Sequence, residues 1–180
     1  MVVDLGTGDG RAVLARARSS SGELVIGIDA SAAAMRVASQ RAAARPSRGG
    51  VPHAWFLVAA AETLPGALAG TADLVTVTLP WGSLLRGVLG RDDPALCGLA
   101  GLLKPGGRLE AFVSVTPRDR VDGFETLSSG AADGIAGAWA AAGLCLASMR
   151  PATLDELRAT GSTWAKRLGP RPVWRLVGQR

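Results

Sequence analysis

Four residues near the start of the chain have the spacing of a ligand-binding loop. Asp4, Gly6, Gly8 and Gly10 occupy alternate positions. Glycines spaced in this way let the backbone turn sharply and approach a ligand that a Cβ atom would hold away. A dinucleotide-binding fingerprint would place its third glycine three residues after the second, where a helix N-terminus faces pyrophosphate. This chain has Arg11 there, so the loop favours a ligand other than NAD.

Two further carboxylates follow apolar runs that read as strands. Asp29 comes directly after residues 24–28, where a carboxylate can accept two hydrogen bonds from a ribose diol. Glu62 follows the next apolar run, within residues 60–65. Together with Asp4, the chain therefore offers three acidic positions after or at the ends of predicted strands.

The elements that position these residues alternate between strands and helices. Apolar and β-branched runs predict strands at 2–5, 24–28, 54–59, 74–78, 108–115, 144–149 and 172–177. Helical spacing and capping residues predict helices at 11–18, 32–44, 93–103, 131–142 and 153–159. This pattern predicts an α/β fold with a mostly parallel seven-stranded sheet covered by helices on both faces, in one domain spanning 1–180. Ligands bind such sheets beyond the carboxyl ends of the central strands.

The Asp-x-Gly-x-Gly-x-Gly loop resembles the first motif of class I S-adenosylmethionine-dependent methyltransferases, which have a Rossmann-like fold. The resemblance implies S-adenosylmethionine as the cofactor and Asp4 as the anchor of the loop. It also implies that Asp29 binds the ribose and that Ala61 and Glu62 lie beside the adenine. The alternative is a glycine turn that binds no ligand.

The residues after the fourth predicted strand concern the substrate. Methyltransferases that act on exocyclic amines of DNA often carry Asn/Asp-Pro-Pro-aromatic here, whereas this chain has Thr78, Leu79, Pro80 and Trp81. Residues 79–90 instead resemble the aminoglycoside-resistance 16S rRNA (adenine-1408) N1-methyltransferases of the kanamycin–apramycin type. Residues 4–10, 61–65 and 162–168 carry the same resemblance.

Membership of that family would imply methylation of N1 of a flipped adenine in the decoding A-site, within the 30S subunit, giving aminoglycoside resistance. Trp81 and Trp164 would stack on the adenine, Leu79 and Pro80 would present backbone carbonyls to its amino group, and Thr163 would contact the cofactor. Adenine N1 carries a free lone pair, so the reaction needs alignment and no general base. The alternative role for Trp81 is core packing.

Basic residues are the candidates for binding RNA. The formal charge of +5 and the pI of about 10.5 favour an anionic partner, although a genome that favours arginine gives the same balance. Lys166 and Arg167, beside Trp164, are expected to face phosphate. The family resemblance implies that Arg167 supports the flipped nucleotide and, more loosely, that Arg171 is a second functional arginine. Arg41 and Arg45, four residues apart on the predicted second helix, are candidates for the rRNA backbone or form a solvated face.

We expect a cytoplasmic, monomeric protein without a metal ion. No apolar run approaches the roughly 20 residues that a membrane helix needs. Cys97 and Cys145 form no metal-binding or disulfide pattern, so we expect both to be core residues. We also expect His53 to be structural and the other tryptophans to be core residues, namely Trp55, Trp139 and Trp174.

Two departures from the family keep other functions open. Its members begin with an additional N-terminal segment, so this sequence is expected either to be truncated or to dock differently, and residues 116–130 differ from the family's linker. One alternative is a small-molecule methyltransferase on the same fold, which would leave Trp81 and Trp164 without a shared purpose. The other is a catalytically weak homologue that binds S-adenosylmethionine or RNA.

Overall fold

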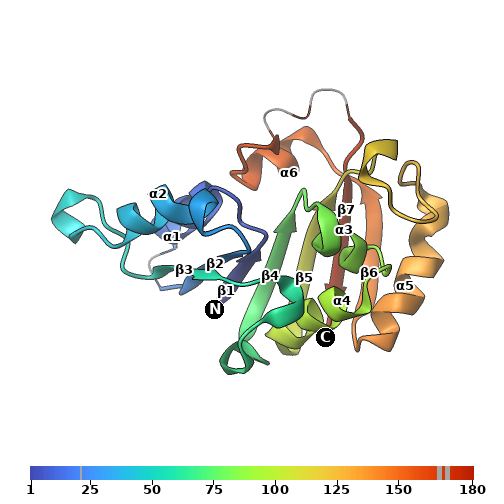
Figure 1. Cartoon of the computed structure of the whole chain (residues 1–180), viewed down its shortest axis with the longest axis horizontal. Helices are drawn as coiled ribbons and strands as arrows, with labels where there is room; N and C mark the ends of the chain where they lie inside the picture. The colour runs from blue at the N-terminus through green and yellow to red at the C-terminus, as the bar shows by residue number, and fades with distance from the viewer. Residues whose placement is uncertain (21, 166–167, 169–170) are drawn as a thin grey trace.

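A mostly parallel sheet organises the molecule, as predicted (Figure 1). The computed structural model describes residues 1–20, 22–165, 168 and 171–180. Its strands are β1 (Val2–Leu5), β2 (Val25–Asp29), β3 (Ala54–Val58), β4 (Ala72–Thr78), β5 (Leu103–Val113), β6 (Cys145–Pro151) and β7 (Trp174–Gln179). They form one seven-stranded sheet in the order β3-β2-β1-β4-β5-β7-β6. The pairs from β3 to β5 are parallel, and β7 runs antiparallel to both of its neighbours.

Six helices lie between the strands in the described part of the chain. They are α1 (Arg11–Ser19), α2 (Ala32–Ala42), α3 (Gly82–Val88), α4 (Asp93–Leu102), α5 (Ala132–Ala141) and α6 (Leu154–Ala159). Short 3-10 turns lie at η1 (Pro46–Arg48), η2 (Ala61–Thr63), η3 (Gly66–Leu68), η4 (Pro117–Asp119) and η5 (Ser129–Ala131). The side chain of Ser31 caps α2 by accepting a hydrogen bond from the backbone N–H of Ala34 at 3.3 Å, as its residue type predicts.

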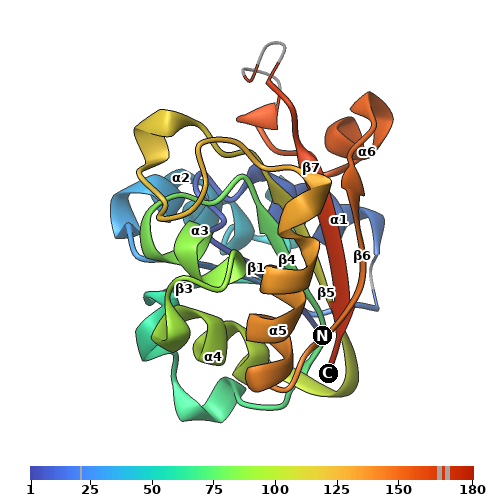
Figure 2. The same cartoon turned by 90° about the vertical axis from the view of Figure 1, so that its right-hand side faces the viewer.

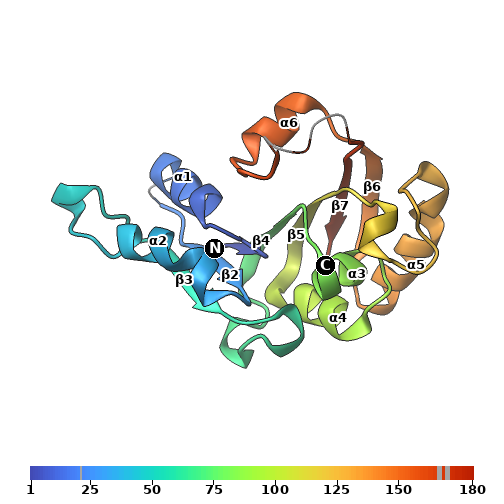
Figure 3. The ribbon, with the colours of Figure 1, turned by 45° about the horizontal axis from the view of Figure 1, so that its top comes forward.

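Two groups of helices cover the sheet. Helices α1 and α2 lie beside β1, β2 and β3 (Figure 3). They bury Val13, Leu14 and Ala38 in one cluster with side chains of these strands. Helices α3, α4 and α5 gather on one side of the sheet (Figure 2), and bury residues such as Leu85 and Leu99 in the largest cluster. Removing each such leucine from water contributes about 1.5–3 kcal/mol, so these contacts fix the strand ends that carry the loops described below.

A small third cluster lies under two loops that are distant in sequence. Phe112, Leu157 and Val173 are buried together. Leu79, which follows β4, packs against this cluster, and so does Ala165, which follows α6. The cluster therefore joins the segment that precedes Trp81 to the segment that carries Trp164.

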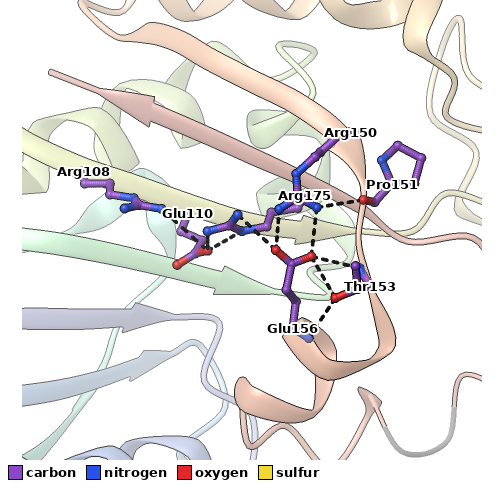
Figure 4. Close-up of polar contacts among 7 residues, drawn as sticks. All are labelled: Arg108, Glu110, Arg150, Pro151, Thr153, Glu156 and Arg175. Carbon is purple, nitrogen blue, oxygen red and sulfur yellow. Dashed lines mark hydrogen bonds and ion pairs between the residues drawn. The ribbon is translucent and has the colours of Figure 1, made fainter.

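An ionic network ties α6 to three strands (Figure 4). Glu156 accepts hydrogen bonds from both terminal nitrogens of Arg150 on β6, and from Arg175 on β7 at 3.2 Å. Arg175 also donates from Nε to Glu110 on β5, at 2.5 Å. Glu156 completes a capping box with Thr153, whose backbone N–H it accepts at 2.9 Å. The hydrogen bonds from Arg150 and Thr153 lower the pKa of Glu156 to about 2.

One helix was missed by the sequence analysis. Helix α3 begins at Gly82, directly after Trp81, within residues 79–90, for which the sequence analysis predicts no helix. Its two glycines and the preceding Pro80 obscure the helical pattern. It forms because Leu85 and Val88 on one face are buried against the main core. Strand β5 also begins at Leu103, five residues earlier than the predicted start at Arg108.

Three residues that we predicted to be in the core are exposed. Trp55 is 59% exposed because it lies on the edge strand β3, where alternate side chains face outward. Cys145 is exposed on the other edge strand, β6, and Cys97 on the outer face of α4. The predictions for Trp139, which is fully buried, and for Trp174, which packs against the core, are confirmed.

The placement of Arg45 on the second helix was also wrong. Helix α2 ends at Ala42, and Arg45 precedes the 3-10 turn η1. Arg41 lies in the last turn of α2, and both arginine side chains are exposed. They therefore belong to one exposed region of the surface but not to one helical face.

Candidate functional site

The glycine loop joins β1 to α1 at the carboxyl end of the sheet. Gly6, Gly8 and Gly10 all have positive φ values, of 75°, 58° and 69°, a region that residues with a Cβ atom rarely adopt. A Cβ atom on Gly6 would lie 2.7 Å from the side chain of Leu84, and one on Gly10 would lie 2.5 Å from Phe56. A Cβ atom on Gly8 would meet no described atom within 4 Å. The outer two glycines thus allow close packing, whereas the middle one faces open space.

Asp29 holds the middle of this loop. Its Oδ2 atom accepts a hydrogen bond from the backbone N–H of Gly8 at 2.8 Å, and its Oδ1 atom accepts one from Ser31 at 2.8 Å. Each carboxylate oxygen can accept more than one hydrogen bond. Asp29 can therefore fix the loop and still accept hydrogen bonds from a ligand beside it.

Asp4 lies beneath the loop and is almost completely buried, at 8% exposure. Its Oδ1 atom accepts a hydrogen bond from the hydroxyl of Thr76 on β4 at 2.8 Å. Burial raises the pKa of Asp4, and hydroxyl hydrogen bonds, including that from Thr76, act against the rise. Asp4 thereby links the floor of the loop to the neighbouring strand.

Ala61 and Glu62 come from the turn η2, after β3. Ala61 is buried and Glu62 is exposed. A hydrogen bond from Ser83 lowers the pKa of Glu62, and the nearby Arg86 acts in the same direction. Ser83 and Arg86 both belong to α3, so this helix sets the electrostatic surroundings of Glu62.

Trp81 follows a strained turn at the end of β4. Leu79 has a φ of 53°, which is uncommon for a residue with a Cβ atom. It is held there by a hydrogen bond from its N–H to the carbonyl of Phe112 at 2.8 Å and by packing in the third cluster. Pro80 is buried, and Trp81 is 84% exposed. Strain of this kind persists only where the surroundings impose it and often marks a functional site.

Trp164 belongs to the segment between α6 and β7. Its side chain is 64% exposed. The preceding residue, Thr163, donates a hydrogen bond from its hydroxyl to Oδ2 of Asp9 in the glycine loop, at 3.0 Å. This contact joins residues that are 154 positions apart in the sequence.

A pocket of about 220 Å³ contains the predicted cofactor site and both predicted stacking residues. Its lining includes Asp4, Gly6, Gly8, Asp9, Asp29, Ala61, Glu62, Leu79, Pro80, Trp81, Thr163 and Trp164. The two tryptophans therefore lie on the same pocket as the glycine loop, although 83 residues separate them in the sequence. Two exposed aromatic rings beside a loop that leaves room for a ligand suit a planar substrate held next to a cofactor.

A second and larger pocket, of about 600 Å³, lies beside the first. It is bounded by α1 and α6 and lined by charged residues such as Arg16, Glu110 and Arg175. Neither tryptophan from the first pocket is in its described lining. The smaller pocket is therefore the better candidate for the reaction.

Three of the basic candidates lie outside the pocket. Arg41, Arg45 and Arg171 are exposed and are not part of the described pocket lining. Lys166 and Arg167 lie outside the described residues. His53 is also outside the pocket, where its ring hydrogen-bonds the carbonyl of Ala17 at 2.5 Å, consistent with a structural role.

Sequence analysis overlooked Asp9 and the residues of α3 that line the pocket. Asp9 stands between two glycines of the motif, a position that could have marked it as a polar group on the loop. Ser83 gave no comparable signal because helix α3 itself was not predicted. Their shared pocket, and the contact between Asp9 and Thr163, appear only when distant segments are brought together.

Within the described part of the chain, no helix has the length and apolar character needed to cross a membrane. The same residues contain no cluster of three or more His, Cys, Asp or Glu side chains suited to a metal ion.

Comparison with known proteins identifies the family. The family model "NpmA: 16S rRNA (adenine(1408)-N(1))-methyltransferase" matches residues 1–172. The chain belongs to this family. A 16S rRNA (adenine(1408)-N(1))-methyltransferase from Streptoalloteichus tenebrarius is 37% identical over 174 residues, which cover 93% of this chain and 80% of the relative.

Solved structures of the family have the same fold. A variant of the 16S rRNA (adenine(1408)-N(1))-methyltransferase from Catenulisporales acidiphilia, crystallised with the cosubstrate SAM, gives a TM-score of 0.88 at 32% identity. The match covers 99% of this chain and 84% of the other. The aminoglycoside resistance methyltransferase NpmB1 gives a TM-score of 0.81 at 38% identity, over 99% and 85% of the two chains. The predicted class I methyltransferase fold is therefore confirmed.

The residues present in the pocket fit S-adenosylmethionine. Open space at Gly8 allows a ligand to approach the backbone. Asp29 and Glu62 both place carboxylates on the lining, and a carboxylate can accept hydrogen bonds from hydroxyl or amino groups. One member of the matching family was solved with this cosubstrate. That finding agrees with the acceptor groups on the pocket lining.

Proposed function

We propose that the protein transfers a methyl group from S-adenosylmethionine to N1 of an adenine in the decoding A-site of 16S rRNA, and so confers aminoglycoside resistance. One observation carries the proposal: Trp81 and Trp164 both line the pocket that contains the glycine loop, and both are mostly exposed. Exposed indole rings beside a cofactor site suit a base that is flipped out of an RNA helix. The family to which the chain belongs is described by the same reaction.

Binding of the cofactor is proposed to involve both the loop and its supports. Gly6 and Gly8 allow backbone contact, Asp29 accepts from the ribose, and Ala61 and Glu62 flank the adenine ring. Asp4 supports the loop from below, and Leu79 and Thr163 complete the lining. S-adenosylmethionine supplies an electrophilic methyl group on a sulfonium centre.

The chain's own contribution to the chemistry is positioning. Adenine N1 already has a lone pair, so no side chain has to remove a proton. Two stacked indoles hold the base, each worth about 1–3 kcal/mol, and their π faces favour the positive charge that develops on the methylated ring.

Adenine is selected, we infer, by the backbone that precedes Trp81. The carbonyl groups of Leu79 and Pro80 are acceptors on the pocket lining, and the exocyclic amino group of adenine is a donor. Guanine presents a carbonyl oxygen at the corresponding position, so the same acceptors would disfavour it. The strained conformation of Leu79 supports this role, because it fixes the direction of the backbone.

The RNA backbone is proposed to contact exposed arginines outside the pocket. Arg41 and Arg45 lie near the end of α2, and Arg171 precedes β7. Lys166 and Arg167 belong to the same proposal from the sequence alone. Each phosphate contact would make binding more sensitive to salt. We further propose that the monomer acts on the assembled 30S subunit in the cytoplasm, without a metal ion.

Primer extension on 16S rRNA tests this function. A methyl group on N1 blocks Watson–Crick pairing and stops the polymerase one nucleotide before the modified base. RNA from 30S subunits treated with the protein and S-adenosylmethionine should show this stop at the decoding-site adenine, and untreated subunits should not. Transfer of labelled methyl to small acceptors without a stop on rRNA would instead support a small-molecule methyltransferase. Cofactor binding without transfer to any acceptor would support a silent homologue.

A further inference from the structure

We propose that Asp9 is a positioning residue that couples the glycine loop to Trp164 through Thr163, so that cofactor binding holds the second indole over the pocket. This inference rests on the proposed function for the role of Trp164, but the contact itself is independent of it. The hydroxyl of Thr163 donates to Oδ2 of Asp9 at 3.0 Å, and both residues line the smaller pocket.

This contact is the long-range hydrogen bond described for residues 160–163, whose other hydrogen bonds are local. The other hydrogen bonds described for residues 160–163 join them to residues 156–160, within the turn that ends α6. Gly161 has a φ of 70° and packs close to Ala12 on α1. Beyond that point, the bond between Thr163 and Asp9 ties the segment to the glycine loop.

Asp9 is itself held by the loop. Its Oδ1 atom accepts a hydrogen bond from the backbone N–H of Arg11 at 3.1 Å, and the side chain of Arg11 lies 3.5 Å from Oδ2. The flanking Gly8 and Gly10 have positive φ, and the N–H of Gly8 is bonded to Asp29. Any change that orders the loop therefore also orders the carboxylate that receives Thr163.

Trp164 lies between Thr163, which is bonded to Asp9, and Ala165, which packs against the third cluster, and it is 64% exposed. A ligand on the glycine loop would restrict Asp9, then Thr163, and so the ring beside it. Coupling between two binding events is reciprocal. S-adenosylmethionine should therefore strengthen the capture of the adenine, and the adenine should strengthen the binding of S-adenosylmethionine.

The first test uses no RNA. Acrylamide quenching of tryptophan fluorescence is measured with and without saturating S-adenosylhomocysteine, and the contribution of Trp164 is obtained by subtracting a Trp164→Phe counterpart of each protein. We expect the ligand to lower the quenching of Trp164 in the wild type. Thr163→Val, which keeps the shape but removes the hydroxyl, should lose this change, and Thr163→Ser should restore it. An equal decrease in Thr163→Val, or none in the wild type, would overturn the proposal.

The second test measures the coupling itself. The affinity of the protein for 30S subunits is compared with and without S-adenosylhomocysteine, which cannot donate a methyl group. The wild type should bind at least about fivefold more tightly with the ligand, whereas Asp9→Ala and Thr163→Val should show little difference. Asp155→Asn provides the control, because its ion pair with Arg158 is exposed on the same helix that precedes the segment. If both variants gain as much affinity for 30S subunits from the ligand as the wild type does, the coupling is contradicted.

Failure of this inference is distinguishable from failure of the proposed function. If primer extension shows no stop on rRNA treated with the wild type, the methylation site is wrong, and the quenching experiment still decides whether the loop controls Trp164. If the stop is present, but Thr163→Val leaves the ratio of the 30S affinities with and without S-adenosylhomocysteine unchanged, the function stands and the role of Asp9 is refuted.

Discussion

Gly98 on α4 lies directly against the backbone of Ala61, so that a Cβ atom on this glycine would come within 1.9 Å of the Ala61 carbonyl oxygen. Real Cβ atoms do not approach backbone oxygens so closely. The absence of a side chain at Gly98 thus lets α4 support the turn η2, from which Glu62 reaches the pocket.

Gly98→Ala should therefore displace the turn that contacts the cofactor. We expect a loss of about 1–3 kcal/mol in the free energy of unfolding, as for other overpacked sites, and weaker binding of S-adenosylmethionine by calorimetry. Gly101→Ala on the same helix is the control, since a Cβ atom there meets no described atom within 4 Å. Equal effects of the two substitutions would show that the contact with Ala61 has no special importance.

Comparing Gly8→Ala with Gly49→Ala should separate the effect of backbone strain on stability from the effect of a blocked ligand site on cofactor affinity. The φ of 58° at Gly8 costs a residue with a Cβ atom roughly 1–2 kcal/mol, and the side chain of that residue would enter the space beside the loop. Gly49→Ala imposes the same kind of strain, at a φ of 80° and in open space away from the pocket. Both variants should lose similar stability, but only Gly8→Ala should raise the Kd for S-adenosylmethionine, by about tenfold or more. A parallel loss of affinity in Gly49→Ala would refute the assignment.

Trp81→Ala and Trp164→Ala should each slow methylation of 30S subunits by about tenfold to a hundredfold, because each stacked ring contributes about 1–3 kcal/mol. Phenylalanine at either position should recover part of the rate. Trp55→Ala is the matched control, since Trp55 is similarly exposed but lies outside the pocket. Rates are measured as incorporation of labelled methyl, together with the affinity for S-adenosylmethionine. Wild-type rates in both alanine variants would remove the basis for base stacking.

Glu156→Gln should make stability less dependent on pH. The hydrogen bonds from Arg150 and Thr153 lower the pKa of Glu156 from 4.5 to about 2. A carboxylate with a depressed pKa stabilises the folded state above its unfolded pKa and loses that effect as the pH falls toward the folded value. The wild type should thus be more stable than Glu156→Gln at pH 6, and the difference should shrink between about pH 5 and 3.

Denaturant unfolding at a series of pH values measures this difference. Asp155→Asn changes an exposed neighbour on the same helix and should leave the pH dependence close to that of the wild type. A difference between the wild type and Glu156→Gln that stays constant down to pH 3 would show that the ionic network does not depend on this carboxylate.

The sequence by itself determined the alternation of strands and helices, the glycine loop and the positions of Asp4, Asp29 and Glu62. These features depend on local rules: β-branched runs favour strands, and glycines at alternate positions favour a loop that approaches a ligand. The same residues, with the run around Trp81, were sufficient to indicate the family.

Tertiary structure alone decided what lies on which surface and which distant segments meet. Trp55 and Cys145 are exposed on β3 and β6, the two edge strands, each of which has a neighbouring strand on one side only. Helix α3 formed against its local glycines because burying Leu85 outweighs weak helical propensity. Asp9 and Thr163 are 154 positions apart in the sequence. Their hydrogen bond forms only when the loop after β1 and the segment before β7 meet in the folded protein, so no local sequence pattern encodes it.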